Sequence, residues 1–202
     1  PVRSPRSESS AARHQPASDH PFLLVTSSGP AADHHGDMFG LYRKTEQMTE
    51  GCTVYIQEHD SQYDYIPCKL SILNKVWVVT LDGAEYLRAT TPSDGPTSVK
   101  WQYRDYPWGD DLALTVTGLS EKPSCECEVT ISLSRDIVRD IKNPGVAGVY
   151  TGDGSYRRGR PVLHHSGGLF TLSVDYSCWR VQSGVGGDLY LYSESAPSQC
   201  PA

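Results

Sequence analysis

The chain has 202 residues, of which 38% are hydrophobic and 21% charged, a composition that suits one substantial core or two small ones. Its formal net charge of −6 argues against nucleic-acid binding, because phosphate recognition draws most of its affinity from lysine and arginine. Apolar runs are short, as in residues 75–79, and none reaches the roughly 20 residues that span a bilayer, so no membrane span is expected.

Residues 1–20 are rich in Ser, Pro, Ala and Arg and are predicted to be a flexible tail. From residue 21 onward, short segments rich in β-branched and aromatic residues alternate with Gly, Pro, Asp and Ser clusters, a pattern typical of all-β structure. In residues 112–117 the alternation is strict, so Leu112, Leu114 and Val116 are expected to face a core. The predicted strands are residues 22–26, 53–58, 69–73, 76–81, 85–89, 98–103, 112–117, 127–133, 161–165, 169–174, 178–182 and 188–193.

The second half of the chain repeats the first. The repeated positions are Gly40, Tyr42 and Gly51, which match Gly148, Tyr150 and Gly159, and Leu70 and Trp77, which match Leu172 and Trp179. At the ends, Val25-Thr26 falls on Val129-Thr130 and Tyr86-Leu87 falls on Tyr190-Leu191. A period of roughly 100 residues is the size of a small domain. The sequence therefore predicts two related antiparallel modules, residues 21–120 and 121–202, of sandwich or barrel type. Trp77 and Trp179 are expected in their cores.

One short helix is predicted over residues 134–142, where Ile137, Val138 and Ile141 share a helical face before Asn143-Pro144-Gly145. The matching stretch of the first module, residues 27–38, contains Gly29, Pro30 and Gly36 and is predicted to be a loop.

The second module lacks counterparts of the last strands of the first. The first continues past Pro92 through two predicted strands, whereas few residues follow the matching Pro197. We expect either a longer array or a close partner, with self-assembly through an open sheet edge, because bare edges tend to pair.

Six cysteines in a chain with two small cores favour disulfides in an oxidising compartment, and hence a secreted, extracellular protein. Cys52 and Cys68 open successive predicted strands and are a candidate pair. Cys178 is predicted to pair with Cys200, with a return of Cys200 to Cys125 or Cys127 left open. Zinc is disfavoured because Cys125-Glu126-Cys127 is a CxC pair without a second close pair.

The segment 101–111 is the strongest candidate for recognition, because it interleaves four aromatic residues with three aspartates and an arginine. Trp101 and Tyr103 are at strand spacing and are predicted to pack in the core. The candidate ligand-binding residues are Tyr106 and Trp108, as exposed stacking rings, with Asp105 and Asp110. A loop held by its own aromatic residues is the alternative.

Asp33, His34, His35 and Asp37 supply imidazole and carboxylate groups, which suit transition metals, and are the weak candidates for a metal site. A solvated polar loop is the alternative, because adjacent histidines rarely reach one ion. His164 and His165 lie in a predicted strand, so their rings should point to opposite faces. No cofactor is predicted.

No nucleophile elbow, Cys–His pair or phosphate loop is present in the sequence, so catalysis would need a site assembled only in the fold. The residues available for a hydrolase are His59, Asp60, His164, His165 and Ser166.

The repeated order of Gly-x-Tyr, Leu-Ser-Ile/Val and Trp-x-Val resembles modules of extracellular multidomain animal proteins, a resemblance that carries over no functional residue. The first hypothesis is a non-catalytic extracellular binding or structural module, with a lectin as its sharper form. A subunit of a larger assembly and a hydrolase are the alternatives. A protein partner or self-assembly is expected, and a glycan is a further candidate ligand.

Overall fold

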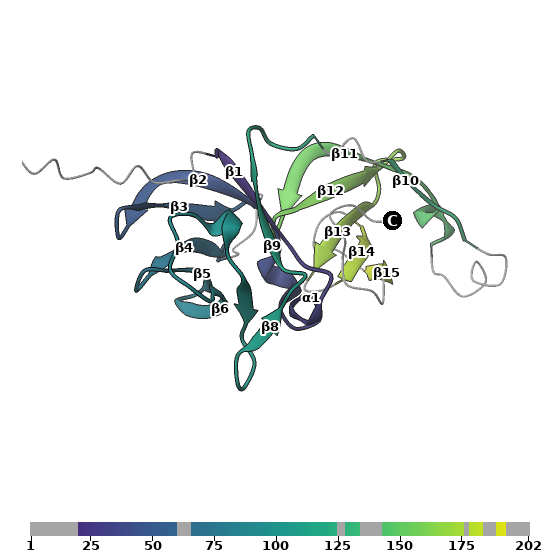
Figure 1. Ribbon diagram of the computed structural model, residues 1–202. Coiled ribbons are helices and arrows are strands. Elements are labelled where there is room, and N and C mark those ends of the chain that lie inside the picture. The colour runs from purple at the N-terminus through teal and green to yellow at the C-terminus, as the bar shows by residue number, and fades with distance from the viewer. Residues whose placement is uncertain are drawn as a thin grey trace, which may run out of the picture.

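The computed structural model describes residues 20–59, 66–124, 128–133, 143–175, 178–183 and 189–192. These residues form two curled antiparallel β-sheets that lie side by side, with one short α-helix (Figure 1). The all-β fold class predicted from the sequence is therefore confirmed.

The first sheet contains nine strands, in the order β8-β7-β6-β5-β4-β3-β2-β1-β9. It is a meander in which each strand from β1 to β8 pairs with the next, and β9 returns to pair with β1. The strands are β1 (Phe22–Thr26), β2 (Gly40–Thr49), β3 (Cys52–Gln57), β4 (Lys69–Leu73), β5 (Val76–Leu81), β6 (Ala84–Ala89), β7 (Trp101–Tyr103), β8 (Gly109–Asp111) and β9 (Thr115–Leu119). A 3-10 turn, η2 (Pro96–Ser98), precedes β7.

The second sheet contains six strands that pair in chain order. Within the described residues it holds counterparts of β1 to β6 only, and its edges are β10 and β15. The strands are β10 (Glu128–Ile131), β11 (Gly148–Arg157), β12 (Arg160–His165), β13 (Thr171–Asp175), β14 (Cys178–Gln182) and β15 (Leu189–Tyr192).

Each sheet curls around its own hydrophobic core. In the first core the largest fully buried side chains include Trp77, Trp101 and Tyr55, and Tyr103 also lies inside. In the second, Trp179 packs among Leu172, Val174 and Val181. The core positions predicted for Trp77, Trp101, Tyr103 and Trp179 are confirmed.

The repeat extends to local geometry. In each module a ten-residue strand, β2 or β11, reverses into its partner through a two-residue turn, Glu50-Gly51 or Arg158-Gly159, with positive φ at both positions. This is the type I′ geometry that matches the twist of the strands. Each ladder also has a register shift in the same place, Lys44/Met48 in one and Gly152/Tyr156 in the other.

Tyr42 and Tyr150, the tyrosines of the repeated Gly-x-Tyr, make the same hydrogen bond in both modules. Each hydroxyl donates to the carbonyl four residues earlier, that of Met38 at 2.6 Å and that of Val146 at 2.7 Å. Both carbonyls end a 3-10 turn, η1 (Gly36–Met38) or η3 (Pro144–Val146). The buried phenol therefore ties the start of each long strand to the turn before it.

We expect Tyr42→Phe and Tyr150→Phe each to lower the free energy of unfolding by about 1–3 kcal/mol, because either change leaves a buried carbonyl without its donor. Urea unfolding of both variants checks this. A loss below the error of the measurement in both would show that water replaces the hydroxyl.

Tyr150 also makes stability depend on pH. Burial raises the pKa of Tyr150 to about 12, so the folded module favours the protonated phenol. The stabilisation of the folded state by the protonated phenol is fully present below the usual pKa near 10 and is lost as the pH rises from about 10 to about 12. The wild type should lose stability over this window more steeply than Tyr150→Phe, and parallel pH curves would contradict the assignment.

The structure corrects the sequence alignment of the two modules at one end. Leu23 lies opposite Tyr42, and Val129 lies opposite Tyr150, so the counterpart of Val129 is Leu23 and not Val25. A shift of two residues keeps every side chain on the same face of the strand, and for this reason the hydrophobic pattern did not reveal it. At the other end the match is as predicted, since Leu87 faces Val79 and Leu191 faces Val181.

The prediction of a loop over residues 27–38 is wrong in its centre, where α1 (Pro30–His35) forms. Pro30 stands in the first turn, where its missing N–H costs nothing. The carboxylate of Asp111, on β8, accepts the N–H of Ala31 at 3.0 Å and caps the helix from a distance of 80 residues along the chain. Because the capping residue is so distant along the chain, the sequence around the helix does not reveal it. The helix predicted over residues 134–142 lies outside the described residues.

The predicted Cys52–Cys68 disulfide is wrong, because neither residue forms a disulfide. Tyr55 pairs with Leu70, which places Cys68 beside Gln57, at the far end of β3 from Cys52. At about 3.3 Å per residue the two cysteines are roughly 16 Å apart along the strand, well beyond disulfide reach. Burial raises the pKa of the Cys52 thiol, with smaller effects from Asp94 and Glu50.

The other predicted pair, Cys178 with Cys200, falls on side chains outside the described part of the chain. Disulfide stapling of the fold is therefore not supported by the structure, in which the described cysteines, Cys52 and Cys68, form no disulfide.

The strand predicted over residues 112–117 begins later than expected, at Thr115. Leu114 and Val116 are buried, but Leu112 is 86% exposed. Asp111 is the cause, because its carboxylate accepts the N–H of Ala113 at 2.9 Å and its carbonyl accepts the N–H of Leu114, which bends the chain into a turn.

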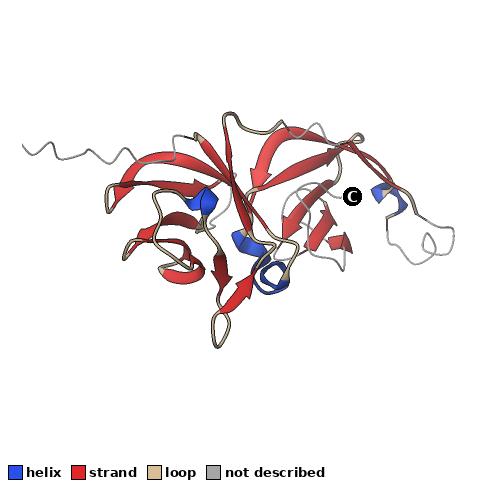
Figure 2. Cartoon of the chain, viewed as in Figure 1, coloured by secondary structure: helices blue, strands red, loops and turns tan. Residues whose placement is uncertain are grey.

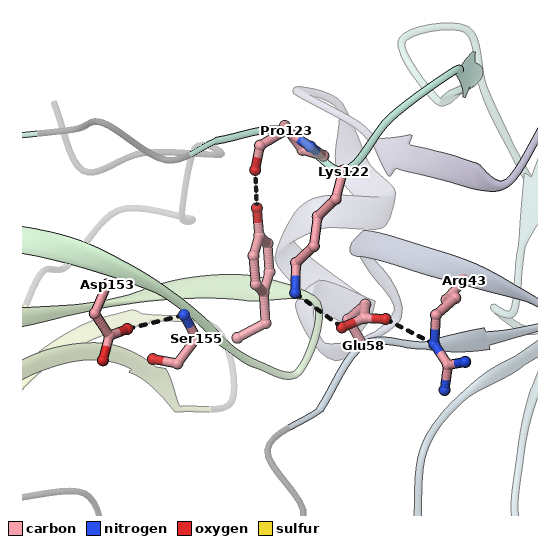
Figure 3. Close-up of polar contacts among 7 residues, drawn as sticks. Arg43, Glu58, Lys122, Pro123, Asp153 and Ser155 are labelled. Carbon is pink, nitrogen blue, oxygen red and sulfur yellow. Dashed lines mark hydrogen bonds and ion pairs between the residues drawn. The ribbon is translucent and has the colours of Figure 1, made fainter.

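The segment between the two sheets is tied to both of them. Lys122 forms an ion pair with Glu58 of the first module at 3.2 Å, and its ammonium group lies 4.4 Å from the centre of the Tyr156 ring of the second (Figure 3). The Tyr156 hydroxyl donates to the Pro123 carbonyl at 2.7 Å. Glu58 also pairs with Arg43 at 2.9 Å. The modules are therefore linked through side chains as well as through the chain.

Candidate ligand-binding site

The loop from β7 to β8, residues 104–108, projects from the edge of the first sheet (Figure 2). The short strands on either side hold its ends together, with Trp101 opposite Asp111 and Tyr103 opposite Gly109. Trp101 and Tyr103 point into the core, whereas the Tyr106 side chain is 85% exposed. The strand pair therefore divides the aromatic residues of this segment between the core and the surface.

Two arginines orient the aromatic rings of the loop. The Arg104 guanidinium lies 5.5 Å from the ring centre of Tyr86 and 5.9 Å from that of Tyr106, and it donates to the Tyr106 hydroxyl at 3.0 Å. The Arg88 guanidinium lies 4.1 Å from the ring centre of Trp108. These cation–π contacts restrain rings that would otherwise move freely at the surface.

The two predicted carboxylates have different roles. Asp105 accepts the N–H of Tyr106 at 2.8 Å and so shapes the loop. Asp110 accepts a hydrogen bond from Nε2 of the Gln102 amide at 2.8 Å, and Oε1 of that amide accepts one from Arg88 at 3.2 Å. Asp110 therefore supports Trp108 indirectly, through Gln102 and Arg88.

An open depression with a volume of about 500 Å³ lies beside the loop. Three of the four predicted ligand residues, Asp105, Tyr106 and Trp108, line it, and Asp110 does not. The sequence analysis missed the part contributed by the turn between β5 and β6, which strand pairing brings next to the loop: the Arg104 N–H donates to the Tyr86 carbonyl at 2.7 Å. The depression is lined by Gly83, Ala84, Glu85, Arg104, Asp105, Tyr106, Pro107 and Trp108.

The four candidate metal ligands make separate contacts. Asp33 is exposed, and Asp37 forms an ion pair with Arg158 at 3.1 Å. His34 stacks on Tyr103, with ring centres 5.5 Å apart. His35 Nε2 lies 2.6 Å from the Arg104 carbonyl, which can only accept, so this nitrogen carries the proton and has no lone pair for a metal.

Across the part of the chain that the structure describes, no group of three or more His, Cys, Asp or Glu side chains could hold a metal ion. The two histidines of α1 instead support the base of the loop, since His35 also contacts the Tyr86 ring edge-on at 5.4 Å.

His164 and His165 point to opposite faces of β12, as predicted. His164 Nε2 lies 3.1 Å from a carboxylate oxygen of Asp153, whereas His165 packs edge-on against Tyr150 and Phe170. Burial raises the pKa of the Asp153 carboxyl, but hydrogen bonds from Ser155 and the charge of His164 outweigh it, so the net pKa is lowered.

Both ring nitrogens of His165 are engaged. Nδ1 accepts the N–H of Gly167 at 3.0 Å, which leaves Nε2 to donate to the Ala147 carbonyl at 3.1 Å. His165 therefore has no free nitrogen for the role of a general base. Asp60, another member of the predicted hydrolase set, lies outside the described residues.

Comparison of the chain with protein-family models, with curated proteins and with solved structures gave no match. Among the described residues no helix is long and apolar enough to cross a membrane. The described residues form two β-sheets, with an aromatic loop oriented by arginines on the first.

Proposed function

We propose that the protein is a non-catalytic extracellular binding module whose recognition site is the loop of residues 104–108 with the adjacent β5–β6 turn. The supporting observation is the exposed Tyr106 ring, 85% accessible, at the rim of the depression beside Trp108. Exposed aromatic rings held in fixed positions are the usual anchors of recognition sites.

A carbohydrate is the ligand that this chemistry favours. The rings of Tyr106 and Trp108 offer flat apolar surface, while Glu85, Asp105 and Arg104 line the same depression with directional polar groups. Sugars present both kinds of surface, because their C–H faces stack on aromatic rings while their hydroxyls pair with carboxylate and guanidinium groups. The extracellular setting rests on the other four cysteines, whose side chains lie outside the described residues, since Cys52 and Cys68 form no disulfide.

The test is binding to a printed array of neutral and acidic oligosaccharides. We expect Tyr106→Ala and Trp108→Ala each to weaken binding about tenfold, since an aromatic contact of this kind contributes about 1.4 kcal/mol. Leu112→Ala is the matched control, because Leu112 is 86% exposed in the turn between β8 and β9 and does not line the depression.

Silence of the wild type across the array would remove the carbohydrate assignment. Retention of full array binding by both aromatic variants would show that the protein binds through another surface.

A further inference from the structure

The junction between the modules contains a specific docking contact, formed by the Arg158-Gly159 turn. In the first module the N–H of Glu58 donates to the Leu41 carbonyl at 2.8 Å, but the Leu41 N–H does not donate back to the Glu58 carbonyl. Gly159 lies between these two groups. Its carbonyl accepts the N–H of Leu41 at 2.8 Å, and its N–H donates to the Glu58 carbonyl at 2.7 Å. A single glycine of the turn thus completes a split strand pair in the neighbouring module.

Three further contacts hold the turn in place. The Gln57 amide donates to the Arg158 carbonyl at 3.1 Å, and Arg158 forms an ion pair with Asp37 at 3.1 Å. Gly40 lies directly below, where a Cβ would be 2.4 Å from the Gly159 carbonyl oxygen. The acceptor is therefore a close-fitting site with acidic side chains, Asp37 and Glu58, around it.

The second module has the same acceptor in the same place. Ser166 is the counterpart of Glu58 and Val149 that of Leu41, and the Ser166 N–H donates to the Val149 carbonyl at 2.8 Å. Among the hydrogen bonds of the described residues, none closes the reciprocal pair between the Val149 N–H and the Ser166 carbonyl. The strand pair that Gly159 completes in the first module is therefore not completed by a backbone group here.

We propose that this second acceptor, Val149 with Ser166, binds the Glu50-Gly51 turn of a second copy of the chain. That turn is the counterpart of Arg158-Gly159 in the first module and has the same positive φ at both positions. It is exposed, and a Cβ on Gly51 would meet nothing within 4 Å. The donor turn and the acceptor with its unpaired backbone groups lie on different modules of one chain, so copies join head to tail.

Charge distinguishes the two acceptors. A turn with Glu50 in place of Arg158 would be repelled by Asp37 and Glu58 at the first acceptor. At the second acceptor the corresponding residues are Gly145 and Ser166, which carry no charge. Like charges brought together at an interface oppose binding, so the Glu50 turn selects the second site.

His165 weakens the proposed association between copies, because its side chain occupies part of the second acceptor. It is the counterpart of Gln57 and donates to the Ala147 carbonyl, just as Gln57 donates to the carbonyl of Phe39. Its Nε2 would lie 2.2 Å from a Cβ on Gly148, in the position that the Gly159 carbonyl takes above Gly40. The imidazole must therefore rotate away before a turn can dock.

Sedimentation velocity of the full chain from about 10 µM to about 1 mM tests the proposal. A head-to-tail contact leaves a turn and an acceptor available at the ends of each open complex, so we expect the mean mass to rise with concentration, either without a limit or up to a closed ring. Gly51→Ala should abolish the rise, because its methyl group would overlap the Val149 N–H while meeting nothing in the monomer. His165→Gln, which copies the first acceptor, should shift the rise to concentrations at least fivefold lower.

A monomer at every concentration for both the wild type and His165→Gln would overturn the proposal. So would association that Gly51→Ala leaves unchanged, which would point to the β15 edge instead. Thermal unfolding confirms that each variant is folded. Oligosaccharide binding is a separate readout, since neither substitution touches the loop of residues 104–108.

Discussion

Gly159→Ala will uncouple the two modules, with a loss of about 3–5 kcal/mol in the free energy of unfolding of the docked pair. Gly159 has φ of +68°, and a Cβ on it would lie 2.7 Å from the Leu41 nitrogen and 3.0 Å from the Gly40 Cα. Both are backbone atoms of a strand and cannot shift cheaply. The turn must withdraw, and the Leu41 N–H and the Glu58 carbonyl then lose their partners, at about 1–3 kcal/mol for each group that water does not reach.

Gly51→Ala is the matched control, because it is the same substitution at the equivalent turn position. Gly51 has φ of +81° and open space around it. Both variants therefore carry the backbone cost of an alanine in the left-handed region, about 1 kcal/mol. Only Gly159→Ala adds the overlap with the neighbouring module, so the difference between the two variants measures the docking contact.

Calorimetry and limited proteolysis check the expected result. The wild type should unfold with the modules coupled, whereas Gly159→Ala should show two separate transitions and faster cleavage in residues 120–124. Equal effects of the two variants would mean that the turn does not couple the modules.

Much of this fold follows from hydrophobic patterning. The strands predicted at 22–26, 69–73 and 76–81 coincide with β1, β4 and β5, since their side chains alternate or run apolar over a buried ladder. The sequence analysis did not predict β2 and β11, the longest strands. Most of β2 past Tyr42 is polar and exposed or half-buried, so it has no period of its own and is extended because β1 and β3 pair with it.

Only those residues of the candidate site that are close together in the sequence could be predicted. Tyr106 and Trp108 were identifiable because aromatic residues in a turn-like segment are unusual. Arg88 and Glu85 were not, because the pairing of β6 with β7 brings them to the loop. The docking turn could not be predicted from the sequence pattern either. Arg158-Gly159 has the sequence of an ordinary hairpin turn, and its partner Gln57 lies more than 100 residues earlier in the chain.

Arg160→Met is expected to raise the free energy of unfolding by about 3 kcal/mol, an unusual direction for a substitution in a core. Arg160 is 3% exposed at the start of β12, directly after the docking turn. Burial lowers the pKa of its guanidinium to about 10, and Tyr42 has an opposing effect. A decrease of this size means that the fold destabilises the charged guanidinium by about 3 kcal/mol relative to water.

Two observations indicate that an apolar side chain would be accepted at this position. Within the described residues the buried Arg160 Nε has no hydrogen-bond partner, so removing the charge breaks no bond there. The counterpart of Arg160 in the first module is Cys52, a free thiol that packs against the core. Apolar groups of similar volume often stabilise a protein when they replace buried charge.

Urea unfolding of Arg160→Met, beside Arg43→Met as control, measures the effect. Arg43 is 62% exposed and pairs with Glu58 on the surface, so its loss should change stability by less than about 1 kcal/mol. Destabilisation by Arg160→Met would show instead that the guanidinium binds an anion from solution at the module junction. In that case added phosphate should stabilise the wild type but not the variant.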